Sequence, residues 1–361
     1  MPTRRQFFSR SAAAMACGCC AGLAYGQTPA PRREVRVGGQ RVRTVDIHCH
    51  VSIPAALDVV KGTPMERALN QQLTGNLKGP PVAQRLAERG ADGIDVEAMS
   101  INPYWYGASR DMARRIIDVQ NAGLAAMCRE APENLRAFAS VALQFPDLAA
   151  EQLEHAVKNL GLCGSAIGGS VNNEEISNPK YDAFWKKAEE LQALVFIHPQ
   201  SEGAPTTIRD RVKGPGALSN VIGNPLETTF ALAHLIFDGT LDKFPNLKIC
   251  AAHGGGYLGS YANRSDAVIR TFPNRVGPLP KKKPTQYLKD GQLFFDTIVF
   301  TPEALRHLIA ESGVGQIMIG TDYPFPWTST EVDLVLNTPG LSDDDRIAIL
   351  GGTAAKLMGI A

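Results

Sequence analysis

The chain has 361 residues, 44% of them hydrophobic, with 37 Lys and Arg against 36 Asp and Glu. This balanced charge does not favour binding to nucleic acid or to an anionic membrane surface, and no apolar run reaches the roughly 18 residues needed to span a bilayer. The length suits a single α/β barrel, because such barrels have roughly 250 residues or more.

The first 26 residues have the pattern of a cleavable export signal. Paired arginines and two phenylalanines in Thr3–Phe8 precede a small, apolar stretch, Ser11–Ala24. This order resembles a twin-arginine signal, so we expect residues 1–26 to be removed and the protein to be periplasmic. Residues 27–41 are rich in Pro, Arg and Gly and are expected to be a linker, and residues 42–361 are expected to form one domain.

Strand-like apolar runs recur along the domain. They alternate with helical patterns, which predicts parallel pairing with right-handed crossovers. Eight such units predict a (β/α)8 TIM-type barrel. The expected strands are Val42–His50, Ile94–Ser100, Arg136–Leu143, Gly164–Gly168, Leu194–His198, Lys248–His253, Leu293–Thr297 and Gln316–Thr321.

Between the strands, apolar residues at three- and four-residue spacing predict helices. The clearest are Asp111–Arg129, Leu148–Leu160, Tyr181–Leu191 and Pro302–Ser312. Val51–Gln84 and Gln200–Asn224 show no such period. Both follow strands that end in polar residues, so we expect them to be loops over the mouth of the barrel.

Histidine or aspartate side chains follow the apolar run of several strands. His48 and His50 end the first, His198 follows a later one, and Asp322 follows the last. Side chains alternate along a strand, so His48 and His50 point to the same side. Imidazole and carboxylate suit zinc, manganese or iron. A single histidine at a strand end is more often structural than a metal ligand. Histidine or aspartate at several strand ends, however, predicts a metal site with one coordination position open to water or substrate.

His253 also ends a strand-like run and is followed by Gly254–Gly256. Glycines allow the backbone to approach a ligand closely. A histidine beside a metal is a candidate general acid/base, because its ordinary pKa is about 6.5. His253 could also be a ligand, and both roles are open at this stage. Cys49 points away from its two neighbouring histidines and is expected to pack in the core.

Four motifs together resemble the amidohydrolase superfamily, and within it the aminocarboxymuconate-semialdehyde decarboxylase-like enzymes. They are DIHCH, FIHP, GNPLETTFALAHLIFDGTLDKFPNLKICAAHGGG and IGTDYPFPW. The resemblance implies a barrel with one divalent metal, commonly zinc, with manganese as an alternative. It implies His48, His50, His198 and Asp322 as ligands. His253 would be the acid/base that works with the metal-bound water, and Asp322 would belong to the catalytic group as well.

The resemblance also implies a homodimer. Arg264, in GSYANRSD, stands where the family has an arginine that reaches the neighbouring subunit's site. A guanidinium can bind a substrate carboxylate through two hydrogen bonds, although a surface ion pair is the alternative. The chain departs from the family at Gln200, which replaces a tryptophan. None of Arg67, Arg85 and Arg89 matches the family's other substrate arginine convincingly. These departures bear on the choice of substrate more than on the metal or the fold.

These features predict a metal-dependent non-oxidative decarboxylase of a small aromatic or muconate-type carboxylic acid. The alternative enzyme is a metal-dependent hydrolase of an ester, lactone or amide on the same barrel, because a metal hydroxide can attack a carbonyl. A further alternative is a non-catalytic periplasmic binding protein. The presence of His253 beside a complete ligand set argues against that alternative. No organic cofactor and no nucleic-acid partner are expected.

Overall fold

The structure is a computed structural model that describes residues 31–75, 79–102, 104–200, 211–327 and 331–360. The export signal expected in residues 1–26 lies outside the described residues. Among the described residues, no helix has the length and apolar character needed to cross a membrane.

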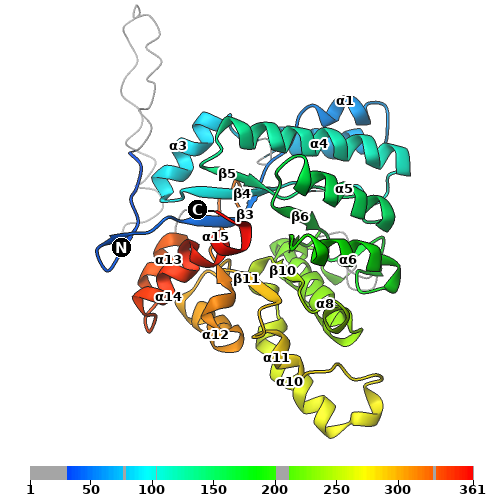
Figure 1. Ribbon diagram of the computed structural model, residues 1–361, viewed down its shortest axis with the longest axis vertical. Helices are drawn as coiled ribbons and strands as arrows, with labels where there is room; N and C mark the ends of the chain where they lie inside the picture. Colours follow the sequence, from blue (N-terminus) through cyan, green and yellow to red (C-terminus); the bar gives the residue numbers. More distant parts are fainter. Residues whose placement is uncertain (1–30, 76–78, 103, 201–210, 328–330, 361) are drawn as a thin grey trace, which may run out of the picture.

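In the described part of the chain, eight parallel strands form the centre of the molecule (Figure 1). Each overlaps one of the runs predicted from the sequence and is shorter than it, and the third begins at Leu135, one residue before its predicted run. They are β3 (Val45–His50), β4 (Val96–Ser100), β5 (Leu135–Ala137), β6 (Gly164–Ile167), β9 (Leu194–Ile197), β10 (Lys248–Ala251), β11 (Leu293–Asp296) and β12 (Ile317–Met318).

Backbone contacts close the strands into a barrel. One sheet has the order β3-β4-β5 and the other the order β6-β9-β10-β11-β12. A bridge between Ala139 and Ser165 joins β5 to β6. At the other seam, Ile47 N donates to Ile319 O at 2.9 Å, which joins β3 to the end of β12. The predicted α/β barrel is therefore confirmed, and the carboxyl ends of its strands share one rim.

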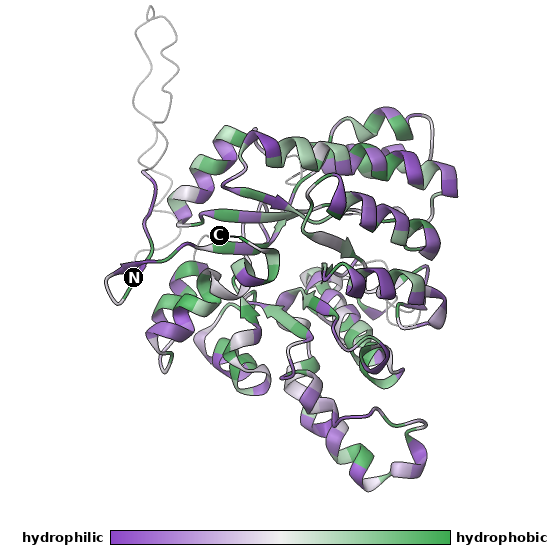
Figure 2. Cartoon of the chain, viewed as in Figure 1, coloured by the Kyte–Doolittle hydropathy of each residue, from purple (hydrophilic) through white to green (hydrophobic). Residues whose placement is uncertain are grey.

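Helices surround the barrel, with hydrophilic residues on their outward faces and hydrophobic residues along the strands (Figure 2). The predicted helices are all present. Pro302–Ser312 forms α12 with the predicted bounds, because Thr301 caps its first turn and Gly313 follows its end. The longer helices are α3 (Val82–Asp92), α4 (Arg110–Glu130), α5 (Pro146–Lys158), α6 (Asp182–Glu190), α8 (Asn224–Phe237), α10 (Leu258–Thr271) and α12.

Shorter elements fill the connections. The remaining α-helices are α1 (Ala56–Val60), α2 (Met65–Thr74), α9 (Thr240–Lys243), α11 (Pro284–Tyr287), α13 (Glu331–Asn337), α14 (Asp343–Ile347) and α15 (Thr353–Met358). Two antiparallel pairs lie outside the barrel and are formed by β1 (Arg36–Val37) with β2 (Gln40–Arg41) and by β7 (Ser170–Val171) with β8 (Glu174–Glu175).

Two segments are more regular than the sequence pattern suggested. The expected linker contains the β1–β2 hairpin, turned by Gly38 and Gly39 with φ values of 55° and 80°, and Val35 and Val37 are buried. Two glycines between strands are a turn signal that the linker interpretation overlooked. The stretch expected to be a loop after β3 contains α1 and α2. Helix α2 carries Met65, Leu69 and Leu73 at four-residue spacing, a short helical pattern that the loop interpretation overlooked.

An apolar floor lies under the carboxyl rim of the barrel. Phe196 on β9 stacks on Phe138 with their ring centroids 5.6 Å apart. The same Phe196 ring lies 4.9 Å from the ring of His48 at the end of β3. The polar residues at the strand ends therefore stand on a dry core, where electrostatic interactions are stronger than in water.

Candidate metal centre

The structure brings the four predicted ligand residues together. His48 and His50 belong to β3, His198 follows β9 and Asp322 follows β12. All four are buried, and one ligand atom from each lies within 4.8 Å of the others. The register of β3 against β4 shifts between Asp46 and Cys49, the stretch that contains His48. Irregularities of this kind re-aim side chains at the ends of strands.

The two histidines of β3 both have an outward partner for Nδ1. His48 Nδ1 lies 2.6 Å from Asp296 Oδ2, and His50 Nδ1 lies 3.0 Å from Ser100 Oγ. The Ser100 hydroxyl also lies 3.2 Å from Cys49 O and can donate its single proton there. Each Nδ1 therefore has an acceptor for its own proton, which leaves a lone pair on each Nε2. The two Nε2 atoms lie 3.1 Å apart and face one another.

His198 has the same arrangement. Its Nδ1 lies 2.7 Å from Pro199 O, so Nδ1–H has an acceptor and Nε2 is left with a lone pair. Asn102 Nδ2 lies 3.0 Å from the same Nδ1, and the flipped amide, which exchanges Nδ2 for the otherwise unpartnered Oδ1, gives Nδ1–H a second acceptor. Asp322 Oδ1 completes the group at 2.9 Å from His50 Nε2. Three imidazole lone pairs and one carboxylate oxygen facing one point form a donor set that fits a divalent zinc or manganese ion.

The electrostatics of the site favour a positive charge. Burial lowers the pKa of both His50 and His198. Burial also acts to lower the pKa of His48, but Asp296 and Asp322 outweigh it and raise that pKa to about 10. Burial acts to raise the pKa of Asp322, and its hydrogen bonds with His48 and His50 hold it far below the usual range instead. A metal ion and a proton therefore compete for the same position.

His253 lies beside this group and is not one of its four members. Its ring centroid is 5.2 Å from that of His48 and 5.3 Å from that of His198. Burial lowers the pKa of His253 to about 4, so the ring is neutral near pH 7. Among the described residues, its Nδ1 has no hydrogen-bond partner. The position suits a group that accepts or delivers a proton next to the metal.

Two aspartates that the sequence argument did not select support the site. Asp296 ends the run LFFD and accepts from His48, so it follows the strand-end pattern that identified the ligands. Asp46 lies earlier on β3 and accepts from His48 N at 3.0 Å and from Thr321 Oγ1 at 2.5 Å. Thr321 precedes Asp322, so Asp46 joins the backbones of two ligand segments. The signal for Asp296 was present in the sequence, whereas Asp46 resembled any buried strand residue.

The arginines considered for substrate binding lie elsewhere. Arg264 is exposed on α10 and lines a surface pocket that contains none of the four ligands. Arg85 is fully buried and donates to Glu97 and, at 2.9 Å, to His50 O. Arg89 is buried in the same cluster. Gln200 is held in place by donating through Nε2 to Ser170 O at 2.9 Å.

Residues 45–360 match the sequence family described as amidohydrolase. The chain belongs to this family. It is 28% identical over 293 residues to 2-amino-3-carboxymuconate-6-semialdehyde decarboxylase from Dictyostelium discoideum, which covers 80% of this chain and 79% of that protein. The likeness therefore spans most of both chains, as the resemblance of the four motifs implied.

Solved structures extend the comparison. The 5-carboxyvanillate decarboxylase from Sphingomonas paucimobilis superposes with a TM-score of 0.80 at 23% identity, covering 89% of this chain and all (100%) of that one. At this identity, the match supports the barrel fold alone. A dihydroxybenzoic acid decarboxylase from Polaromonas sp., solved with bound manganese and the inhibitor 2-nitroresorcinol, has a TM-score of 0.73 at 25% identity and covers 88% of this chain and 97% of that one.

Proposed function

We propose that the protein is a metal-dependent non-oxidative decarboxylase of a small aromatic carboxylic acid. The observation that carries this proposal is the donor set of three imidazoles and Asp322, with the neutral ring of His253 beside it. The named relatives with decarboxylase activity support the reaction type, and the dihydroxybenzoic acid decarboxylase supports the aromatic class of substrate.

His48, His50, His198 and Asp322 would hold the metal. When bound, the metal supplies a positive charge that attracts and polarises oxygen atoms of the substrate. The apolar floor around Phe196 limits access of water from below. Water exclusion strengthens the attraction between charged groups in the site.

His253 is the proposed proton carrier. Loss of carbon dioxide breaks a carbon–carbon bond and leaves its electron pair on a ring carbon, which must then receive a proton. A histidine with a pKa of about 4 is neutral at rest, so it would take this proton from water in the site and pass it readily to the ring carbon. Its Nδ1 has no competing partner among the described residues, so it is available for this transfer.

The identity of the metal forms part of the proposal. Three nitrogen donors and one oxygen donor suit zinc, the metal expected from the family resemblance. Manganese, which is bound in the Polaromonas enzyme, is the alternative. Elemental analysis of protein purified without added metal, followed by reconstitution with each ion, distinguishes the two.

We also propose a homodimer in which Arg264 reaches the site of the partner subunit. The support is its exposed position on α10, outside the metal site of its own chain. Mixing Arg264→Ala chains with His253→Asn chains should restore part of the activity, because one of the two sites then has both residues. Activity no higher than the sum of the two variants would contradict a shared site.

Export to the periplasm is a separate proposal, supported by the paired arginines and the apolar stretch of residues 3–24.

The test of the function is product analysis on metal-loaded protein. Dihydroxybenzoic, carboxyvanillic and aminocarboxymuconate-type acids should release carbon dioxide, and esters, lactones and amides should remain unchanged. Hydrolysis of the second group without carbon dioxide from the first would replace the decarboxylase with the hydrolase. Protein that binds no divalent metal after reconstitution would refute the proposed centre.

A further inference from the structure

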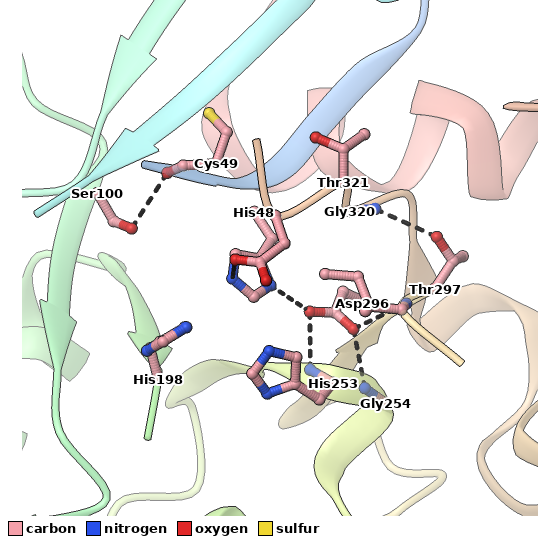
Figure 3. A network of polar contacts seen from close by, with 12 residues as sticks. His48, Cys49, Ser100, His198, His253, Gly254, Asp296, Thr297, Gly320 and Thr321 are labelled. Atoms are coloured by element: carbon pink, nitrogen blue, oxygen red, sulfur yellow. Dashed lines mark hydrogen bonds and ion pairs between the residues drawn. The ribbon is translucent and has the colours of Figure 1, made fainter. Parts of the chain in front are cut away.

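The carboxylate of Asp296 lies between the two halves of the site. It is fully buried at the end of β11, and both of its oxygen atoms accept hydrogen bonds. Oδ2 accepts from His48 Nδ1 at 2.6 Å and from His253 N at 2.9 Å. Oδ1 accepts from Gly254 N at 2.8 Å and from Ile298 N at 3.1 Å. Figure 3 shows Asp296 between the ring of His48 and the turn that carries His253.

The contact with His48 determines which ring nitrogen carries the proton. A carboxylate can only accept a hydrogen bond, so the proton between the two groups belongs to His48 Nδ1. The lone pair of His48 is then on Nε2, which faces His50 and Asp322. A partner that donated to Nδ1 would move the proton to Nε2 and remove the lone pair from the metal position.

The contacts with the turn hold His253 in an unusual backbone conformation. His253 has a φ of 55°, a backbone angle that residues other than glycine rarely adopt, and Gly254 has a φ of 62°. The two successive N–H groups both point at Asp296, as Figure 3 shows. Such a pair of N–H groups forms a concave anion site. Without an acceptor there, nothing in the turn would satisfy these donors or keep the ring of His253 facing the ligands.

We propose that Asp296 is a positioning residue that sets the proton of His48 on Nδ1 and holds the backbone of His253 beside the metal position. The inference deepens the proposed function and rests on the same metal centre. The single side chain of Asp296 would therefore align the metal ligand His48, on β3, with the proton carrier His253, in the turn after β10.

Asparagine at this position tests the inference, because it keeps the shape and replaces one oxygen with an NH2 donor. If the NH2 took the place of Oδ2, it would face the N–H of His253 and force the proton of His48 to Nε2. If it took the place of Oδ1, it would face the N–H groups of Gly254 and Ile298. Neither orientation satisfies both halves of the site.

The matched control is Asp238→Asn. Asp238 follows α8 and is exposed, and its Oδ2 lies 2.9 Å from His234 Nδ1, so it makes the same type of contact at the surface, where Ser177 Oγ also donates to it at 2.6 Å. Competition with a fluorescent chelator should show that Asp296→Asn binds Zn²⁺ roughly ten- to a hundredfold more weakly than the wild type. Asp238→Asn should bind Zn²⁺ like the wild type. Equal affinity of Asp296→Asn and the wild type would overturn the inference.

Nitrogen-15 NMR of the histidine rings gives a second readout that general destabilisation would not move. In the zinc-loaded wild type, the Nδ1–H proton of His48 should be shifted strongly downfield because the Asp296 carboxylate accepts it, and a shift typical of a solvent-exposed ring N–H would overturn the inference even if Asp296→Asn failed to fold. At saturating Zn²⁺, Asp296→Asn should also have a lower kcat because His253 is displaced.

Wild-type protein that binds Zn²⁺ but does not release carbon dioxide would refute the decarboxylase function alone. The NMR result would still decide the role of Asp296.

Discussion

Replacing Glu97 with glutamine should destabilise the fold severely. Glu97 on β4 accepts from Arg85 Nε at 2.7 Å and from Arg85 Nη2 at 3.0 Å, and both side chains are buried. Burial acts to lower the pKa of Arg85, but the charge of Glu97 outweighs it and raises that pKa. A guanidinium stays protonated in proteins, so Arg85 keeps its charge after the substitution but loses the opposite charge that offsets its burial. Leaving a buried charge unpaired costs about 3–5 kcal/mol.

The control is Glu151→Gln on α5. Glu151 faces Arg114 through two similar contacts, at 3.1 Å and 3.3 Å, but the two side chains are 61% and 42% exposed. Solvent screens such a pair, so the free energy of unfolding should stay close to that of the unaltered protein. The comparison isolates burial, because the chemistry of the two substitutions is the same.

Urea unfolding of chelator-treated protein measures both variants. With a slope of about 3 kcal/mol/M, the expected loss moves the Glu97→Gln midpoint down by about 1 M or more. The same variant should bind metal more weakly, because Arg85 donates to His50 O at 2.9 Å and supports a ligand strand. If Glu97→Gln lost no more stability than Glu151→Gln, the argument from the buried charge would be wrong.

Three further predictions concern single residues. His253→Asn should keep its metal and lose activity by about a hundredfold or more, whereas His155→Asn on the exposed face of α5 should keep its activity; turnover of metal-loaded protein decides this. Burial acts to raise the pKa of Asp95, but hydrogen bonds from Arg32, Thr44 and Arg41 hold it low. The ionised Asp95 carboxylate therefore stabilises the fold above about pH 4, and this stabilisation is lost as the pH falls through the lower pKa of the folded state. Asp95→Asn should lower the free energy of unfolding measured in urea at pH 7, and the loss should become smaller below pH 4. Thr301→Ala removes the cap on α12, a contact of 3.2 Å with Ala304 N, and should cost about 0.5–2 kcal/mol in the same assay.

Much of the fold could be predicted because the barrel repeats a local pattern. Each buried parallel strand is a short apolar run, and each amphipathic helix such as α12 carries its own capping signals. The elements that were missed have weak patterns. Helix α2 has one short stripe of Met65, Leu69 and Leu73, and the β1–β2 hairpin has strands of two residues. Both have local signals, but patterns this short also occur in irregular segments, and packing against distant parts of the chain stabilises the two elements.

The sequence by itself determined where the chemistry lies. His48, His50, His198 and Asp322 follow strands that share a rim, and period-two alternation places the first two on one side. Only the tertiary structure decided how these groups are prepared. His48 meets Asp296 across 248 residues of sequence, and Asp322 meets His50 across 272. The position of a histidine proton depends on such a partner, because the two ring nitrogens differ only in what surrounds them. The closed barrel therefore brings the ends of three strands, β3, β9 and β12, into one set of inward lone pairs, with His253 held beside it.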